Sequence, residues 1–444
     1  MAPASFDFVV VGGGPAGCVV ASRLSEDPDC AVCLVEAGPD YGAYDEGRWP
    51  ADILDARRLA LDSHRWAQTD PEDRSQARAR VLGGCSSHNA CALVRGLPDE
   101  YDDWGPGWTY VELEPYFDRA ERQLGAYWIP REDLSPWHRA FAEACGEDTI
   151  RHPFNLKGTV RWNAAFAYLD PARPRPNLTI LGDTTVDRIE TGKVITAQGE
   201  LEAGTVVLAA GAYGTPGVLL RSGIGPGLEH DLPVGEGLAD HVGVGMAWET
   251  TARCLEETAA YEAVHPLFMA GVTARGRSGH DPDGLPDLFL FPGLDPGPEI
   301  SAAVFAMKPR SRGSVRLTSA DPEAPLAIDH GFLRDPYDAE VLTAGFEQLR
   351  SLAEREPISR YAGTERRPGS AVSPAEHVRT AVRGFFHPAG TAAMGSVVDS
   401  RCRVLGLETI VVADASVMPT IPRANTLVTV AAVAERLAEA LKEA

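Results

Sequence analysis

The chain's 444 residues are too many for one simple hydrophobic core and enough for a nucleotide-binding domain plus a second domain. Acidic residues outnumber basic ones by 63 to 41, and the resulting formal net charge of −22 argues against nucleic acid or an anionic membrane as a partner. No apolar run approaches the length of about 18 residues that a membrane span requires, so we expect none.

The first predicted element is a buried parallel strand at 8–11, where Phe8 begins a continuous apolar run. Glycines rather than a cleavage site follow this run, so it predicts a strand and not a signal peptide, and we expect a cytoplasmic protein. Cys30 and Cys33 form a C-x-x-C within a second apolar run, but no second pair accompanies them. The cysteines are therefore interpreted as buried thiols, and no metal site is expected.

A glycine-rich turn separates the first strand from a predicted helix at 18–24. Gly12, Gly14 and Gly17 stand in the pattern G-x-G-x-x-G, which combines a tight turn, close approach of the backbone to a pyrophosphate, and close helix–strand packing. The helix N-terminus offers unpaired N–H groups to the anion. The residues predicted to bind a dinucleotide here are Gly12, Gly14, Pro15, Ala16 and Gly17.

A second predicted strand at 31–35 ends at Glu36. An acid at this spacing after the glycine motif accepts hydrogen bonds from a ribose hydroxyl. The two strands, the turn and the helix together predict a Rossmann unit. They do not distinguish FAD from NAD.

Four later segments resemble the glucose–methanol–choline (GMC) oxidoreductase family, in that family's order. They contain the motifs R-V-L-G-G-C-S-S-H-N from Arg80, G-A-Y-G-T-P from Gly211, K-P-R-S-R-G from Lys308, and H-P-A-G-T from His387, the last followed by Asp414 and Asn425. The chain departs from the family at Gly237, where the family usually has an asparagine ahead of the Leu-x-Asp-His sequence, so we expect a local difference in that turn.

The resemblance implies an extended FAD whose pyrophosphate lies at the first glycine motif. It also implies that the loop of Gly83 and Gly84 passes along the flavin ring, that the Asp414 segment covers the ribityl and phosphate part, and that Val186 lies near the adenine. The residues assigned to FAD in addition to the glycine motif are Glu36, Ala37, Arg80, Gly83, Gly84, Ser87, His88, Asn89, Ala90, Val186, Ala210, Asp414, Ala415 and Thr426.

A more specific hypothesis concerns the bond between His88 and the flavin. Its segment is similar to that of choline oxidase, in which the histidine is covalently joined to the flavin, whereas many other family members leave this position unlinked. A covalent link and a noncovalent histidine facing the flavin both remain open.

Alcohol oxidation by hydride transfer needs a base near neutral pH and a group that holds the developing alkoxide. The resemblance places the family's catalytic histidine at His387, after two phenylalanines and before a proline, where the chain is expected to turn. It also assigns Asn425 as a hydrogen-bond donor to the substrate oxygen. Asn425 can instead be the N-cap of a predicted helix at 427–441.

The resemblance therefore implies an α/β protein of the GMC fold: a Rossmann-type FAD-binding domain plus a substrate domain with an antiparallel sheet backed by helices. We expect the FAD-binding domain at 1–240 with 385–444, and the substrate domain at 241–384. Residues 126–160 are a lid or an insertion of the substrate domain. Within the substrate domain, 304–307 and 314–317 are predicted strands and 337–354 a predicted helix.

The predicted function is FAD-dependent oxidation of a small alcohol, with oxygen or an organic molecule as electron acceptor and a monomer or homodimer as the assembly. Two alternatives are a flavin-retaining lyase, such as a hydroxynitrile lyase, and a non-redox flavoprotein on the same fold. The particular alcohol is not encoded in any motif.

Overall fold

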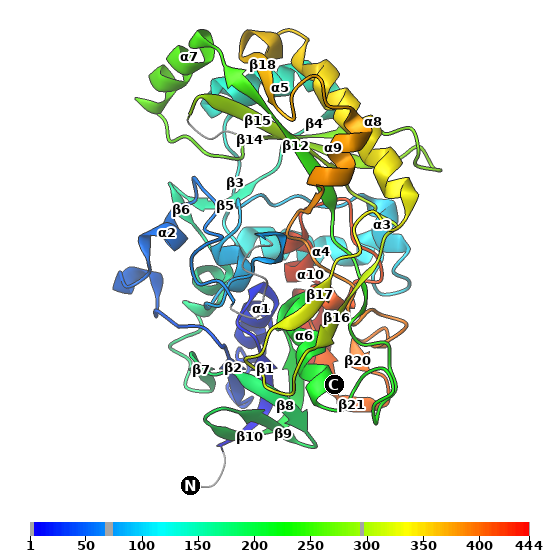
Figure 1. Cartoon of the computed structure of the whole chain (residues 1–444). Coiled ribbons are helices and arrows are strands. Elements are labelled where there is room, and N and C mark those ends of the chain that lie inside the picture. Colours follow the sequence, from blue (N-terminus) through cyan, green and yellow to red (C-terminus); the bar gives the residue numbers. More distant parts are fainter. Residues whose placement is uncertain (1–3, 67–73, 294–296, 444) are drawn as a thin grey trace.

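The computed structural model describes residues 4–66, 74–293 and 297–443. Two large sheets organise the molecule, one in the lower half and one in the upper half of Figure 1. The lower sheet has the order β20-β21-β10-β1-β2-β7, and the hairpin β8-β9 continues from β10. Its strands are β1 (Ala4–Val11), β2 (Val32–Val35), β7 (Leu178–Leu181), β8 (Val186–Glu190), β9 (Lys193–Thr196), β10 (Gly199–Leu208), β20 (Arg403–Val404) and β21 (Leu407–Val412).

The central strands of the lower sheet are parallel, and their carboxyl ends coincide. Val11 of β1 lies opposite Leu208 of β10 and Val35 of β2, and Leu208 lies opposite Val412 of β21. Ligands of open parallel sheets bind at this edge, just beyond the strand ends. The strands predicted at 8–11 and 31–35 are thereby confirmed.

Helices cover this sheet and complete the Rossmann layer. α1 (Pro15–Leu24) packs on α10 (Thr426–Lys442), α10 packs on α4 (Tyr110–Gln123), and α6 (Gly211–Arg221) follows β10 directly. The carboxy-terminal helix predicted at 427–441 is therefore present. Chain segments more than 400 residues apart in sequence meet in one core, because α1 and α10 share an apolar interface.

The upper sheet is antiparallel, with the order β18-β12-β15-β14-β13-β4 and β19 paired to β12. Its strands are β4 (Thr149–Ile150), β12 (Val242–Thr250), β13 (Thr273–Gly276), β14 (Leu288–Gly293), β15 (Glu299–Ala306), β18 (Ala362–Arg367) and β19 (Arg383–Gly384). Helices α5 (Pro136–Cys145), α7 (Ala252–Glu262), α8 (Pro336–Ala353) and α9 (Pro374–Ala381) lie in the same half of the molecule (Figure 1).

The two faces of the upper sheet have different neighbours. On one face, Gly345 of α8 approaches Val304 and Leu288 so closely that an added Cβ would lie within 3 Å of both side chains. On the other face, the ring of Phe305 stacks on Phe385 at 3.7 Å between centroids. Helices thus back one face, as predicted, and the second face is turned toward the segment that leads to His387.

One predicted strand belongs to a different sheet from the one expected. β16 (Gly313–Leu317) pairs with β11 (Glu236–Leu238) and β17 (Leu326–Asp329) in a separate three-stranded sheet against α6. Val315 is fully buried there beside Tyr213, and its N–H donates to the carbonyl of Gly235. Burial of Val315 in this small core stabilises the pairing of β16 outside the upper sheet.

The remaining elements are short. They are α2 (Ala51–Leu54), α3 (Pro98–Asp102), the three-stranded sheet of β3 (Ala126–Tyr127), β5 (Phe154–Lys157) and β6 (Val160–Arg161), and several single helical turns. The pairing of β4 with β13 joins part of 126–160 to the upper sheet, whereas the division into 1–240 with 385–444 and 241–384 stays a prediction. In the part of the chain that the structure describes, no helix is long and apolar enough to cross a membrane.

Candidate active site

The glycine turn after β1 is built for close backbone contact. Gly12 has a φ of +102°, and a Cβ there would lie 2.6 Å from the carbonyl oxygen of Ala209. A Cβ on Gly17 would lie 1.9 Å from the carbonyl oxygen of Gly12. A Cβ added to Gly14, by contrast, would lie 3.9 Å from its nearest neighbour, the carbonyl oxygen of Ala209. The backbone is therefore open on the side where α1 begins at Pro15 and continues through Ala16. The turn can therefore accept a phosphate at the helix N-terminus.

Glu36 lies at this turn, at the end of β2. Its carboxylate accepts hydrogen bonds from the N–H of Gly13 at 2.7 Å and from the N–H of Gly38 at 2.8 Å. Burial raises the pKa of this carboxyl to about 7, and the two main-chain donors oppose that rise. The acid expected to meet the ribose thus also fixes the turn, a role that the motif did not reveal.

The loop predicted to follow the flavin ring rests on the glycine turn. The N–H of Gly83 donates to the carbonyl of Gly13 at 2.7 Å, and a Cβ on Gly84 would lie 2.6 Å from the Cα of Gly14. Gly84 begins a short helical turn that ends at Ser87, whose hydroxyl donates to the carbonyl of Leu82. Two motifs about 70 residues apart therefore form one surface.

His88 follows that helical turn and is 2% exposed. Neither of its ring nitrogens has a hydrogen-bond partner among the described residues, and burial lowers its pKa to about 4. Asn89 accepts the N–H of Cys91 with its side-chain oxygen, and Ala90 is partly buried against the second hydrophobic core. A neutral imidazole without partners is thus held beside the loop of Gly83 and Gly84.

Arg161 holds this loop in place, and sequence reasoning did not identify it. Its side chain is fully buried, and its guanidinium donates to the main-chain carbonyls of Asn89 and Ser87 at 2.9 and 3.0 Å. The same guanidinium also reaches the carbonyls of Ile53, Asp55 and Arg58. No local signal marks this residue, because the carbonyls to which it donates belong to segments that are distant in sequence.

Arg80 and Val186 lie together, away from the glycine turn. The Arg80 guanidinium donates to the carbonyl of Ala37, to the hydroxyl of Thr185 and to the carboxylate of Glu323. Val186 is the first residue of β8 and is 7% exposed. Arg80 is thus joined to the segment of Val186 through Thr185, the residue before it.

Asp414 joins β21 to the N-terminus of α6. One carboxylate oxygen accepts the N–H of Gly211 at 2.8 Å and the hydroxyl of Thr215 at 2.5 Å, and the other accepts the N–H of Ser416. Ala210 is the N-cap of α6, and the carbonyl of Ala415 accepts the N–H of Gly390. The segment predicted to close over the cofactor is thus tied to the sheet edge.

His387 lies where the two halves of the molecule meet, just after Phe386, whose φ of +64° turns the chain sharply. Its main-chain N–H donates to Asp240, and its Nδ1 lies 2.9 Å from Nδ1 of His241. Its Nε2 lies 3.4 Å from Nδ2 of Asn425. Burial, with help from His241 and Arg78, lowers the pKa of His387 well below its usual value.

His241 determines which nitrogen of His387 carries the proton. The Nε2 of His241 lies 2.9 Å from the carbonyl oxygen of Pro422, which can only accept, so this nitrogen carries a hydrogen. Burial lowers the pKa of His241 to about 3, so the ring is neutral and its Nδ1 is an acceptor. His387 must then donate from Nδ1, which leaves the lone pair on its Nε2.

Asn425 is the N-cap of α10, but its side chain makes no capping hydrogen bond. Its Nδ2 points at Nε2 of His387, and its buried Oδ1 has no partner among the described residues. Thr426 is the first residue of the helix. The amide is thus available for a ligand rather than committed to the helix end.

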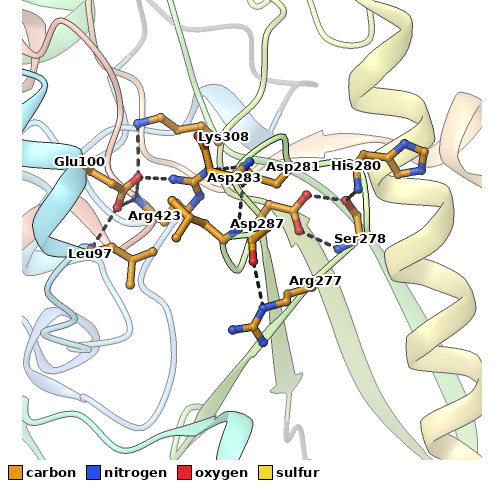
Figure 2. Close-up of polar contacts among 12 residues, drawn as sticks. Leu97, Glu100, Arg277, Ser278, His280, Asp281, Asp283, Asp287, Lys308 and Arg423 are labelled. Carbon is orange, nitrogen blue, oxygen red and sulfur yellow. Dashed lines mark hydrogen bonds and ion pairs between the residues drawn. The ribbon is translucent and has the colours of Figure 1, made fainter.

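An ionic network holds the segment that carries Asn425 (Figure 2). The carboxylate of Glu100, on α3, accepts the main-chain N–H and the guanidinium of Arg423, and it pairs with Lys308 at 3.3 Å. The other end of the Arg423 guanidinium reaches Asp281, in the β13–β14 hairpin of the upper sheet, at 2.5 Å. The network connects the catalytic segment to both halves of the molecule.

Comparison with known proteins assigns this geometry to a family. Two family models, both described as GMC oxidoreductase, match residues 6–243 and 309–434. This chain is a GMC oxidoreductase. The matched regions contain the motifs on which the resemblance rested, apart from Lys308, which lies one residue before the second region. The family, its fold and its activity class, FAD-dependent oxidation of an alcohol, are therefore confirmed.

Individual relatives agree with this assignment. The GMC oxidoreductase is 34% identical to 5-(hydroxymethyl)furfural oxidase of Methylovorus sp. (strain MP688), over 98% of each chain. It is 30% identical to the oxygen-dependent choline dehydrogenase of Paraburkholderia xenovorans (strain LB400), over 100% of this chain and 95% of the relative. Pyridoxine 4-oxidase from Mesorbium loti has a similar structure, with a TM-score of 0.85 and 27% identity over 99% of both chains.

The residues of this GMC oxidoreductase fit FAD. Around the carboxyl edge of the lower sheet, the glycine turn forms an open anion cradle, and the loop at Gly83 and Gly84 lies on it. Buried polar atoms without partners gather near it: both nitrogens of His88, Nδ2 of Asn163 and Oγ of Ser416. Such atoms are unfavourable unless a ligand satisfies them.

Proposed function

We propose that the enzyme oxidises primary alcohols, with His387 as the base and Asn425 as the hydrogen-bond donor to the substrate oxygen. The ring contact between His241 and His387 supports this most strongly, because it leaves Nε2 of His387 unprotonated and next to the Asn425 amide. The hydroxyl proton passes to Nε2, and the amide N–H stabilises the developing negative charge on oxygen. Bound FAD supplies the hydride acceptor.

The substrate class is supported by the relatives. The names of three of them specify 5-(hydroxymethyl)furfural, choline and pyridoxine, each of which has a –CH2OH group. The same names support oxygen as the electron acceptor, in which case alcohol and O2 give aldehyde and H2O2. The lyase and the non-redox flavoprotein are not favoured, because these relatives are oxidoreductases.

Anaerobic flavin reduction tests the assignment. The purified holoenzyme is mixed without oxygen with primary, benzylic, sugar and amino alcohols, and bleaching of the flavin absorbance is followed. His387→Gln should slow bleaching about 10²- to 10⁴-fold, the usual contribution of a general base. His280→Gln, at a half-exposed histidine of the hairpin, is the control and should leave the rate unchanged. An unchanged rate in His387→Gln would show that His387 is not the base.

A further inference from the structure

The sheet face turned toward His387 carries an unusual row of side chains. In the register of the upper sheet, Gly243 of β12 lies opposite Phe305 of β15, Phe305 opposite Phe289 of β14, and Phe289 opposite Arg275 of β13. Opposite residues of an antiparallel sheet point to the same face. The row therefore leads from the ring that stacks on Phe385, next to His387, to a guanidinium.

Among the residues that the structure describes, Arg275 has no counterion. Its Nε is buried without a hydrogen-bond partner, and no described residue forms an ion pair with it. The nearest acid that influences it electrostatically is Glu100, which is already bonded to Arg423 and Lys308. The side chain is partly buried, and a guanidinium partly withdrawn from water without a partner favours an anion beside it.

Thr273 adds a second unsatisfied group at the same place. It lies two residues before Arg275 on β13, so its side chain points to the same face. It is 2% exposed, and its hydroxyl has no partner among the described residues. A hydroxyl next to a guanidinium fork is a donor set that matches a carboxylate.

We propose that Arg275 and Thr273 form a subsite for the carboxylate of a hydroxy acid whose hydroxymethyl group lies at His387. This inference rests on the proposed function and specifies its substrate class. Two strand spacings separate β13 from β15, about 10 Å, which suits a molecule with an alcohol at one end and an acid at the other. The partly exposed rings of Phe291 and Phe385 lie on this face, 6.3 Å apart between centroids. They favour a flat apolar body, so the best substrates are aryl alcohols with a carboxylate opposite the –CH2OH group.

The test compares 4-(hydroxymethyl)benzoate with benzyl alcohol. The wild-type holoenzyme should show a higher kcat/KM for the carboxylate, and Arg275→Gln should reduce the ratio of the two values at least tenfold. Thr273→Val removes only the hydroxyl and should reduce the ratio in the same direction. Arg277→Gln changes an arginine of the same hairpin that is half exposed, and it should leave the ratio unchanged.

Equilibrium binding separates this inference from the proposed function. 4-Methylbenzoate has no alcohol, so its dissociation constant, measured by calorimetry on the holoenzyme, reports the subsite alone. It should bind more tightly than neutral 4-methylbenzamide, and Arg275→Gln should abolish the difference. Equal affinity of the two compounds for the wild type overturns the subsite even if benzyl alcohol bleaches the flavin. Absence of bleaching by any alcohol overturns the proposed function instead.

Discussion

The pair His241–His387 shows how a catalytic residue depends on a partner that the motifs do not identify. The sequence placed His387 by its surroundings, but it contained no sign that His241, 146 positions earlier, donates to Pro422 and accepts from His387. These two hydrogen bonds form only when the start of β12 and the segment of His387 come together in the folded protein. The tautomer of the base is therefore a property of the fold.

Replacement of His241 tests its positioning role. His241→Phe removes the acceptor for Nδ1 of His387, so the ring loses its fixed tautomer, and we expect flavin reduction to slow about tenfold, the equivalent of one hydrogen bond. His241→Gln retains one acceptor and one donor and should recover most of the rate. The acid limb of the pH–rate profile should lie below pH 6.5 in the wild type, because burial lowers the pKa of His387, and should move in His241→Phe. A profile that is the same in all three proteins would contradict the role.

The buried ring of His88 bears on how the flavin is held. Its unpartnered, neutral ring beside the Gly83–Gly84 loop supports a covalent link to the flavin. If the link exists, acid precipitation should leave the yellow colour in the protein pellet, and His88→Ala should release it to the supernatant. Release of all colour from the wild type would rule out the covalent form and leave a noncovalent histidine facing the flavin.

At the scale of elements, the sequence predicted what local patterns encode. The apolar runs gave β1 and β2, the glycine spacing gave the turn before α1, and the 3.6-residue periodicity gave α8 and α10. It missed Arg161, which donates to carbonyls of two separate segments, and it placed β16 in the wrong sheet. Strand pairing over long distances depends on which small core forms, and alternation in one strand does not encode that choice.

The β13–β14 hairpin is tied to the catalytic segment through Asp281 and Arg423, whose side chains are each 7% exposed. Asp281→Asn removes one charge from this buried pair and should destabilise the protein by about 3 kcal/mol, since loss of one partner leaves the other charge uncompensated. Because Arg423 lies two residues before Asn425, the rate of flavin reduction should fall as well. Urea unfolding and anaerobic reduction measure the two effects. Asp283→Asn, in the same hairpin but outside the ion pair, should change neither.

For the molecule as a whole, the acidic composition argues against nucleic acid and anionic membranes as partners. The family resemblance supplied the fold that local patterns alone could not. The lower sheet is completed by segments from both ends of the chain that return to one edge: the glycine turn near residue 12 and Asp414 both contact the residues that follow β10. A sequence predicts this contact between distant segments only when motifs in both segments are found together. The domain limits had no such motif, so they remain a prediction.

The buried histidines make the stability of the whole molecule depend on pH. Burial lowers the pKa of His88, His138 and His152 to about 4 and that of His241 to about 3. Below their ordinary pKa of about 6.5 the unfolded chain binds these protons and the folded chain does not, so the free energy of unfolding falls as pH drops from about 6.5 toward 4. Glu36 and Asp240, whose pKa burial raises to about 7, act in the opposite direction, as do Asp170 and Asp414, whose pKa burial also raises. His387 and the carboxyls that arginines hold below their usual pKa, such as Asp40 and Asp55, act in the same direction as the four histidines.

Urea unfolding of the holoprotein between pH 4.5 and about 7 measures this slope. We expect the free energy of unfolding to increase with pH across the acidic part of the range. His152→Phe removes one proton-binding group that lies outside the active site and packs on Phe154, so the slope should decrease by about one proton, or 1.4 kcal/mol per pH unit, whatever the variant's absolute stability. His265→Phe, at a half-exposed position, is the matched control and should keep the wild-type slope. If His152→Phe keeps the wild-type slope, His152 is protonated in the folded protein as well, and burial does not keep this histidine neutral.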